Sequence, residues 1–265
     1  MILYTRQIGI RRIGWTLDVR FAQAFFVPPN SENLPSCDVV YCLQVPEPPE
    51  GHYAWPFCTL ALDLEPPEET IFGRIKPEVR RQIRQLEKEG THTADITADP
   101  SPAMVDAFCA FYADFAGSKG VDNLHPEEMR AIAHERALVL ACARDRDGTP
   151  LVWHAYYRGA SRAVQLCSAS HFRSTSDRSA RAVIGKANRW LHWRTLLHFR
   201  GMGIALFDFG GWYAGTRDQD LLRINAFKEE FGGRLLHEWN SRLGRSMKGK
   251  ALVAMKRWRE HLQKD

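Results

Sequence analysis

The order of secondary-structure elements predicted between residues 92 and 240 constrains the fold more than any other feature of the sequence. Apolar runs, helical spacing and turn residues together predict β-α-α-β-β-β-α-β-α-β. The strands are expected at His92–Ile96, Ala137–Ala143, Leu151–Tyr157, Ala163–Ala169, Ile204–Phe209 and Leu235–Trp239. The helices are expected after Ser101, near Pro126–His134, and over Arg178–Arg200 and Leu221–Phe231. This alternation predicts an α/β (α+β) fold with a mixed sheet flanked by helices.

Shorter elements flank this series on both sides. Val39–Val45 and Phe57–Leu64 are predicted strands, and Phe21–Val27 is an apolar run of undetermined type. Pro77 suits the first turn of a helix that ends at Gly90, and Lys248–Leu262 predicts a closing basic helix. We therefore expect a β-containing region over residues 1–74, packed on a domain over residues 75–265.

Two motifs narrow the possibilities. Arg80-Arg81-x-x-Arg84, followed by Glu89-Gly90, forms a basic helix, and Phe207–Gly211 (FDFGG) is followed by Phe227–Gly232 (FKEEFG). The element order resembles the GNAT acyltransferase superfamily, and the motifs resemble its Fem-type (FemAB-like) branch over residues ~75–240. The resemblance implies a GNAT-like fold with a short β-containing N-terminal extension or a partial second GNAT-like lobe. It also implies transfer of an acyl group from a thioester or ester to an amine or hydroxyl.

The sequence departs from this resemblance at two places. Fem-type peptidyltransferases carry two GNAT-like halves and often a coiled-coil arm, whereas the first ~75 residues here are short for a second copy. GNAT enzymes carry glycines in the loop that binds the donor's pyrophosphate, but His171–Ser179 contains none. The donor therefore stays open among acyl-CoA, acyl-carrier protein and aminoacyl-tRNA, each as a co-substrate and none as a tightly bound cofactor.

Donor binding is expected at two segments. A helix N-terminus binds anions through its free N–H groups, and the loop before the long helix adds charge and hydroxyls. The candidates there are Arg173, Ser174, Thr175, Ser176, Arg178 and Ser179, with a polar capping loop as the alternative. The resemblance associates Lys228 with the reactive end of the donor. Asn225 lies one turn earlier on the same side of the helix and is, with Phe227, a further donor-binding candidate. A cation at a helix C-terminus explains Lys228 structurally as well.

Catalytic and acceptor-binding candidates lie nearby. Asp208 is the one charge in an apolar strand, so it either acts on the acceptor amine or bonds the following turn. His171 is a candidate for proton transfer. The acceptor-binding candidates, each with a packing, turn or solvated-face alternative, are Gly210, Gly211, Trp212, Tyr213, His154, Arg80 and Arg84.

Composition limits the class of protein. Six cysteines without CxxC spacing predict reduced thiols rather than a disulfide framework. No apolar run approaches the length of a signal-peptide core or a membrane span, so we expect a soluble, cytoplasmic protein. A net charge of +5 favours anionic ligands. No zinc-ligand spacing, GxSxG elbow or P-loop occurs.

Three functions remain. The first is acyl transfer from acyl-CoA or an acyl-carrier protein to an amino sugar, amino acid or peptide. The second is aminoacyl-tRNA-dependent transfer on the same fold, since basic helices can contact tRNA phosphates. The third is a non-catalytic binding module that keeps the fold. The oligomeric state is not predicted.

Overall fold

The computed structural model describes residues 1–10, 15–27, 34–173 and 177–262. The chain forms two compact units, one of residues 1–58 with 237–265 and one of residues 59–236. We expected the boundary after residue 74 and assigned the whole C-terminus to the larger domain. That division is corrected, because the last helix and most of the last strand belong with the N-terminal strands.

The larger unit contains the expected series, preceded by two helices. Its helices are α1 (Glu68–Arg74), α2 (Pro77–Glu89), α3 (Pro102–Lys119), α4 (Pro126–His134), α5 (Arg178–Gly201) and α6 (Gln219–Glu229), with the 3-10 turn η2 (His171–Arg173). Its strands are the second half of β4 (Tyr53–Asp63), then β5 (Thr93–Thr97), β6 (Leu138–Arg144), β7 (Pro150–Arg158), β8 (Arg162–Ser170) and β9 (Leu206–Gly211). From β5 onward the order is the predicted one, and α1 is the helix that the sequence did not reveal.

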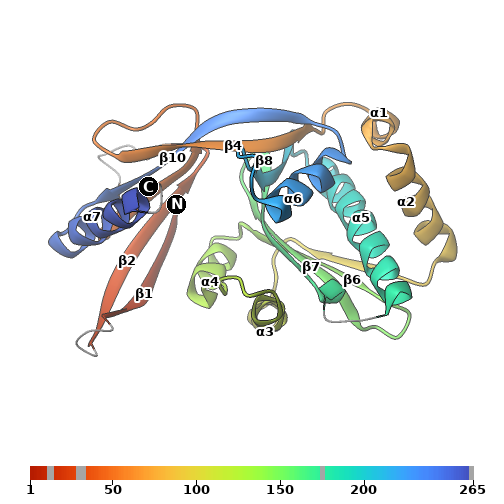
Figure 1. Ribbon diagram of the computed structural model, residues 1–265, viewed down its shortest axis with the longest axis horizontal. Coiled ribbons are helices and arrows are strands. Elements are labelled where there is room, and N and C mark those ends of the chain that lie inside the picture. The colour runs from red at the N-terminus through yellow and green to blue at the C-terminus, as the bar shows by residue number, and fades with distance from the viewer. Residues whose placement is uncertain (11–14, 28–33, 174–176, 263–265) are drawn as a thin grey trace. The chain divides into compact units, whose positions relative to one another are not determined.

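The sheet of this unit runs in the order β4-β9-β8-β7-β6-β5. Neighbouring strands are antiparallel except for β8 and β9, which are parallel. Helices α2 and α5 cover one face, and α3 and α4 lie on the other (Figure 1). Val79, Ile83 and Leu86 of α2 are buried in the core on the α5 face, which confirms the apolar spacing of this helix.

Local signals in the sequence fix several ends of these elements. The Ser101 side chain accepts a hydrogen bond from Met104 N and caps α3. Gly90 ends α2 with a φ of 61°, a left-handed conformation that glycine adopts without strain. Asp145 Oδ1 accepts hydrogen bonds from the amides of Asp147 and Thr149 and closes the predicted hairpin between β6 and β7.

The smaller unit contains β1 (Ile2–Ile10), β2 (Trp15–Phe25), β3 (Val39–Val45), most of β10 (Arg234–Gly244) and α7 (Met247–Leu262). Its strands pair in the order β1-β2-β3-β10, parallel between β2 and β3 and antiparallel elsewhere. The undetermined run Phe21–Val27 is therefore largely strand. Leu252 and Val253 of α7 pack against Val19, Phe21 and Val39.

All six cysteines are free, as expected. Among the described residues, no helix combines the length and the apolar character needed to cross a lipid bilayer.

Candidate functional site

Strands β8 and β9 separate along their length and leave a cavity between them. They pair only from Arg162 to Val164 and from Leu206 to Asp208. Beyond these residues a cavity of about 740 Å³ lies between Gln165–Ser170 of β8 and Phe209–Gly211 of β9. Helices α3, α5 and α6 complete its walls. In a gap of this kind, an extended ligand can replace the missing strand neighbour.

Lys228 brings a buried amine to this cavity. It lies in the last turn of α6, and only 8% of its surface is exposed. Its Nζ donates to the carbonyl oxygens of Gly210, at 3.2 Å, and Gly211. Burial lowers the pKa of Lys228 from 10.5 to about 8, while the nearby Asp208 carboxylate opposes that shift. The amine is therefore a cation at neutral pH, held where a carbonyl or phosphate of a ligand can reach it.

Asp208 lies one strand position before the cavity opens and does not line it. Its fully buried carboxylate is paired with the Arg162 guanidinium, whose Nε lies 3.1 Å from Oδ2. Oδ1 also accepts hydrogen bonds from Thr59 Oγ1 and, at 2.6 Å, from Gly210 N. Of the two roles predicted for Asp208, its geometry matches the structural one, because the carboxylate holds the Gly210 turn and pairs a buried guanidinium.

Gly210 and Gly211, both acceptor-binding candidates, line the cavity. Gly210 has a φ of 72°, and a Cβ at this position would lie 2.8 Å from the Gln165 carbonyl oxygen. Glycine is thus required here by the backbone itself. The same close approach marks the point at which β8 and β9 begin to diverge.

Asn225, Trp212 and Tyr213 support this wall from behind. Asn225 Oδ1 accepts from Tyr213 N at 3.1 Å, and its Nδ2 donates to Tyr213 O at 2.7 Å. Trp212 packs against the hydrophobic core. None of the three lines the cavity, so the structure assigns them to positioning the segment between β9 and α6.

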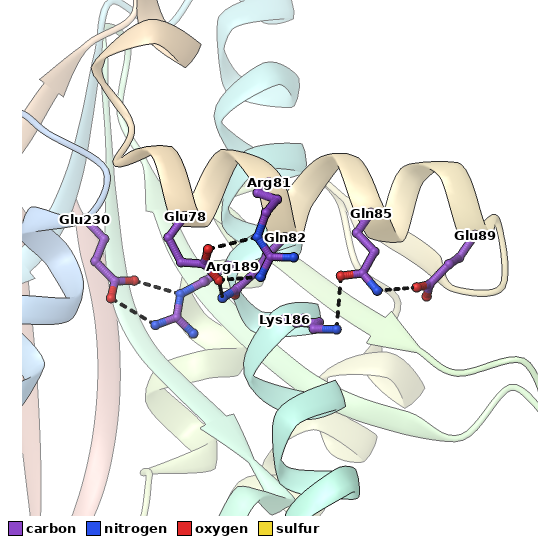
Figure 2. Close-up of polar contacts among 8 residues, drawn as sticks. All are labelled: Glu78, Arg81, Gln82, Gln85, Glu89, Lys186, Arg189 and Glu230. Atoms are coloured by element: carbon purple, nitrogen blue, oxygen red, sulfur yellow. Dashed lines mark hydrogen bonds and ion pairs between the residues drawn. The ribbon is translucent and has the colours of Figure 1, made fainter.

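Phe227 lines the cavity, and Arg189 of α5 holds the same wall. The Arg189 guanidinium lies over the Phe227 ring and donates to Glu230 through Nε at 2.7 Å and Nη2 at 2.9 Å. Figure 2 shows this two-bond ion pair beside Lys186, which donates to Gln85 of α2. These contacts tie α5 to the end of α6 and to α2.

The rings of His154 and His192 lie tilted against each other at the cavity, with centroids 4.2 Å apart. His154 is fully buried, and its Nε2 lies 2.7 Å from Asn188 Oδ1. It therefore reaches the cavity only through Asn188, which lines it. His192 does line the cavity, although its Nδ1 has no hydrogen-bond partner among the residues that the structure describes. Burial lowers the pKa of both imidazoles, that of His154 to about 4, so both are neutral at neutral pH.

The predicted donor loop is only partly described. Ser174, Thr175 and Ser176 lie outside the described residues, and so does the Arg173 side chain. Arg178 and Ser179 are exposed in the first turn of α5. Asp177 caps this helix by accepting hydrogen bonds from Ser179 N at 2.9 Å and Ala180 N at 3.3 Å. The chain's own carboxylate thus occupies the N–H groups that we expected to bind a donor phosphate.

His171, Arg80 and Arg84 are not brought to the cavity lining. The His171 ring packs against Phe111, with centroids 4.3 Å apart. Arg84 lies over the Phe72 ring and borders a different cavity of about 580 Å³. These three residues stay predictions, since Arg84 contacts Phe72 and His171 contacts Phe111 of α3 rather than the cavity.

The cavity also contains polar groups that sequence reasoning missed. Within the described part of the chain, Nε2 of the buried Gln165 side-chain amide has no hydrogen-bond partner. Asn188 and His192 lie one helical turn apart on α5. Polar residues at this spacing inside a long, otherwise apolar helix face were the available signal. Tyr112, Phe115 and Lys119 of α3 complete the wall and carried no such signal.

Comparisons with known proteins bear on the fold. No protein-family profile and no curated protein matches the sequence at a significant level. The structure is similar to a crystal structure of FemX, with a TM-score of 0.59 at 11% identity over 91% of this chain and 88% of FemX. The C-terminal domain of a putative lysylphosphatidylglycerol synthetase from Agrobacterium fabrum has a TM-score of 0.50 at 13% identity, covering 81% of this chain and 71% of that one.

A third similar structure is L-PGS from Bacillus licheniformis, with a TM-score of 0.50 at 11% identity over 82% of this chain and 72% of the other. At these identities the likeness establishes the fold. The predicted resemblance to Fem-type and GNAT-type proteins is thereby confirmed as a resemblance of structure.

Proposed function

We propose that the chain is an acyltransferase that moves an acyl group from a thioester or ester donor to an amine or hydroxyl acceptor in the cavity between β8 and β9. The acceptor nitrogen or oxygen forms the new bond to the acyl carbon, the donor's C–S or C–O bond breaks, and the leaving sulfur or oxygen takes up the acceptor's proton. The observation that carries this proposal is the position of Lys228, a buried cation on the cavity wall beside Gly210 and Gly211. Acyl transfer develops negative charge on a carbonyl oxygen, and a fixed cation in a buried site stabilises that charge strongly.

In this mechanism the donor lies along the free edge of β8. Beyond Val164 the peptide groups on that edge are not paired with β9. They can therefore form hydrogen bonds with an extended amide-containing or ester-linked chain. The donor carbonyl then faces Lys228 Nζ, and the acceptor approaches from the side of α3 and α6. The reacting groups gain most from being held together in line within the cavity.

His192 and Asn188 orient the acceptor. A neutral imidazole accepts or donates a hydrogen bond, whereas its lowered pKa makes it a poor base at neutral pH. His154 donates from Nε2 to Asn188 Oδ1 and thereby fixes the direction of the Asn188 amide. The Asn188 NH₂ group is left to bond a substrate oxygen.

The donor is a thioester, acyl-CoA or an acyl-carrier protein, or alternatively an aminoacyl-tRNA. The Asp177 cap favours the alternative, because a carboxylate at the α5 N-terminus repels the pyrophosphate that CoA would place there. The resemblance of the FDFGG and FKEEFG motifs to Fem-type proteins supports the same alternative.

A donor panel tests the proposal. The purified chain is incubated with acyl-CoA, acylated carrier protein and aminoacyl-tRNA, each with amino-sugar, amino-acid and peptide acceptors, and products are detected by mass. We expect one donor class to give an acylated acceptor, and we expect Lys228→Met to lose that product. Lys186→Met is the matched control, because Lys186 lies on α5 and bonds Gln85 outside the cavity.

If no donor class reacts or binds, the proposal fails and the third possibility, a binding module, is favoured. If product forms equally with Lys228→Met, acyl transfer stands but the role assigned to Lys228 does not.

A further inference from the structure

Helix α7 of the smaller unit carries a second apolar stripe that faces away from its own sheet. Leu252 and Val253 face inward and pack on the sheet. Met247, Met255 and Trp258 are exposed by 83%, 45% and 64%. Residues spaced by three, four or eight positions share one helix face, so these three side chains form one outward stripe along with the exposed Ala251.

Cations border this stripe. Lys250 and Arg257 lie two turns apart on one flank, and both are exposed. The helix has five Lys and Arg residues and a single acidic residue, Glu260. Glu260 is turned toward the sheet, where its Oε2 accepts from Arg242 Nη2 at 2.7 Å and from Tyr53 OH at 3.2 Å. The outward face is therefore apolar and positively charged.

A cavity of about 1020 Å³ opens beside the same face. Lys250, Arg257 and Trp258 stand on its wall with apolar residues of α7. The Arg257 guanidinium is held over the Tyr53 ring, 5.4 Å from its centroid. This hollow has room for an anionic group next to the apolar stripe.

The cations on the outward face of α7 indicate what kind of partner binds there. Two copies that paired through this face would set their Lys250 and Arg257 side chains against each other, which costs free energy through like-charge repulsion. An anionic lipid surface provides negative charge for the cations and an apolar layer for the stripe. Tryptophan in particular favours the boundary between lipid headgroups and acyl chains.

We propose that α7 binds to the surface of an anionic lipid bilayer, with Met247, Met255 and Trp258 in the interfacial layer and Lys250 and Arg257 on the lipid phosphates. This places the chain at a membrane surface without crossing it. The proposal does not depend on acyl transfer, since all its residues lie in the smaller unit.

Vesicle flotation with the full chain tests it. We expect the chain to float with vesicles that contain phosphatidylglycerol in phosphatidylcholine, to stay unbound with phosphatidylcholine alone, and to be released by added salt. Lys250→Gln and Arg257→Gln should each weaken partitioning about fivefold, whereas Arg257→Lys retains it. When the chain binds anionic vesicles, we expect its tryptophan emission to shift to shorter wavelength. Trp258→Ser should abolish this shift and reduce binding.

Met202→Ser is the matched control, because Met202 is an exposed methionine outside α7 and should leave binding unchanged. Since the substituted side chains are exposed, a urea midpoint equal to that of the wild-type chain verifies folding. Absence of flotation with anionic vesicles, or equal binding by Trp258→Ser, overturns the proposal. So does a stable dimer that Trp258→Ser converts to a monomer.

Discussion

The two ends of the β8–β9 pair differ in the partners of their buried charges. At the paired end, Asp208 and Arg162 neutralise each other inside the sheet. At the separated end, the Lys228 cation has peptide carbonyl groups as hydrogen-bond partners and faces a cavity. A buried charge with an ionic partner is neutralised within the fold, and removing its partner destabilises the structure, whereas a charge held by neutral dipoles at a cavity is available to a ligand.

Only a few residues separate these two environments. The Gly210 amide donates a hydrogen bond to Asp208, and the Gly210 carbonyl oxygen accepts one from Lys228. The turn therefore links the structural charge to the candidate catalytic charge. The comparison predicts that variants at the paired end affect stability and that variants at the separated end affect activity.

The largest effect is expected for Asp208→Asn. Removing one partner of a buried ion pair leaves the Arg162 guanidinium uncompensated, which costs about 3–5 kcal/mol. Urea denaturation measures this loss. Asp95→Asn is the matched control, since Asp95 forms an exposed ion pair with Arg144 and should cost less than about 1 kcal/mol. Equal losses for the two variants would contradict the structural role.

Lys228→Met should instead lower catalytic activity without lowering stability. We expect turnover to fall about 10²–10³-fold, as when a fixed oxyanion-stabilising group is removed, with no loss in the free energy of unfolding at neutral pH. Steady-state kinetics on the donor identified above give the first quantity and urea denaturation the second. A variant that unfolds but keeps its specific activity would place Lys228 among the structural charges.

The pH dependence should separate the same two roles. The folded-state pKa of Lys228, about 8, lies below its ordinary value of 10.5, so between these values the unfolded chain binds more protons. The contribution of Lys228 to the free energy of unfolding should therefore rise as pH increases from about 8 to 10. The rise should be absent from Lys228→Met when both chains are unfolded by urea at each pH. Activity that needs the ammonium should fall as the pH passes the folded-state pKa of about 8.

Gly210→Ala should lower stability moderately, because Gly210 bonds both Asp208 at the paired end of β8 and β9 and Lys228 at the separated end. A left-handed φ and a close contact with the Gln165 carbonyl oxygen together cost about 1–3 kcal/mol. Gly90→Ala is the control, because Gly90 has a similar φ of 61° and open space around it, so it isolates the backbone contribution. If the two variants lose equal stability, the close approach to β8 contributes nothing.

Asp177→Ala should have the smallest effect. Loss of the side-chain cap of α5 costs about 1 kcal/mol. If the donor carries a phosphate to this helix end, removing the carboxylate also lowers the KM for that donor. An unchanged KM would indicate that the donor binds elsewhere in the cavity.

Much of the fold could be predicted because its signals are local. The order of elements from β5 to β10 follows from apolar periodicity and from residues such as Ser101 and Gly90, which act within one turn of the chain. Lys228, Phe227, Gly210 and Gly211 were also found from the sequence, since they lie in one short motif. The division into units could not be predicted, because β10 and α7 join the N-terminal strands through long-range pairing.

The sequence by itself determined which elements form and which motif borders the cavity. Tertiary structure alone decided the role of each charge. Asp208 is structural because the fold places Arg162 and Thr59, distant in sequence, against its carboxylate. Lys228 has an open cavity beside it because β8 and β9 stop pairing after Val164. Burial and charge pairing depend on neighbours that local spacing does not encode, so only the folded chain assigns them.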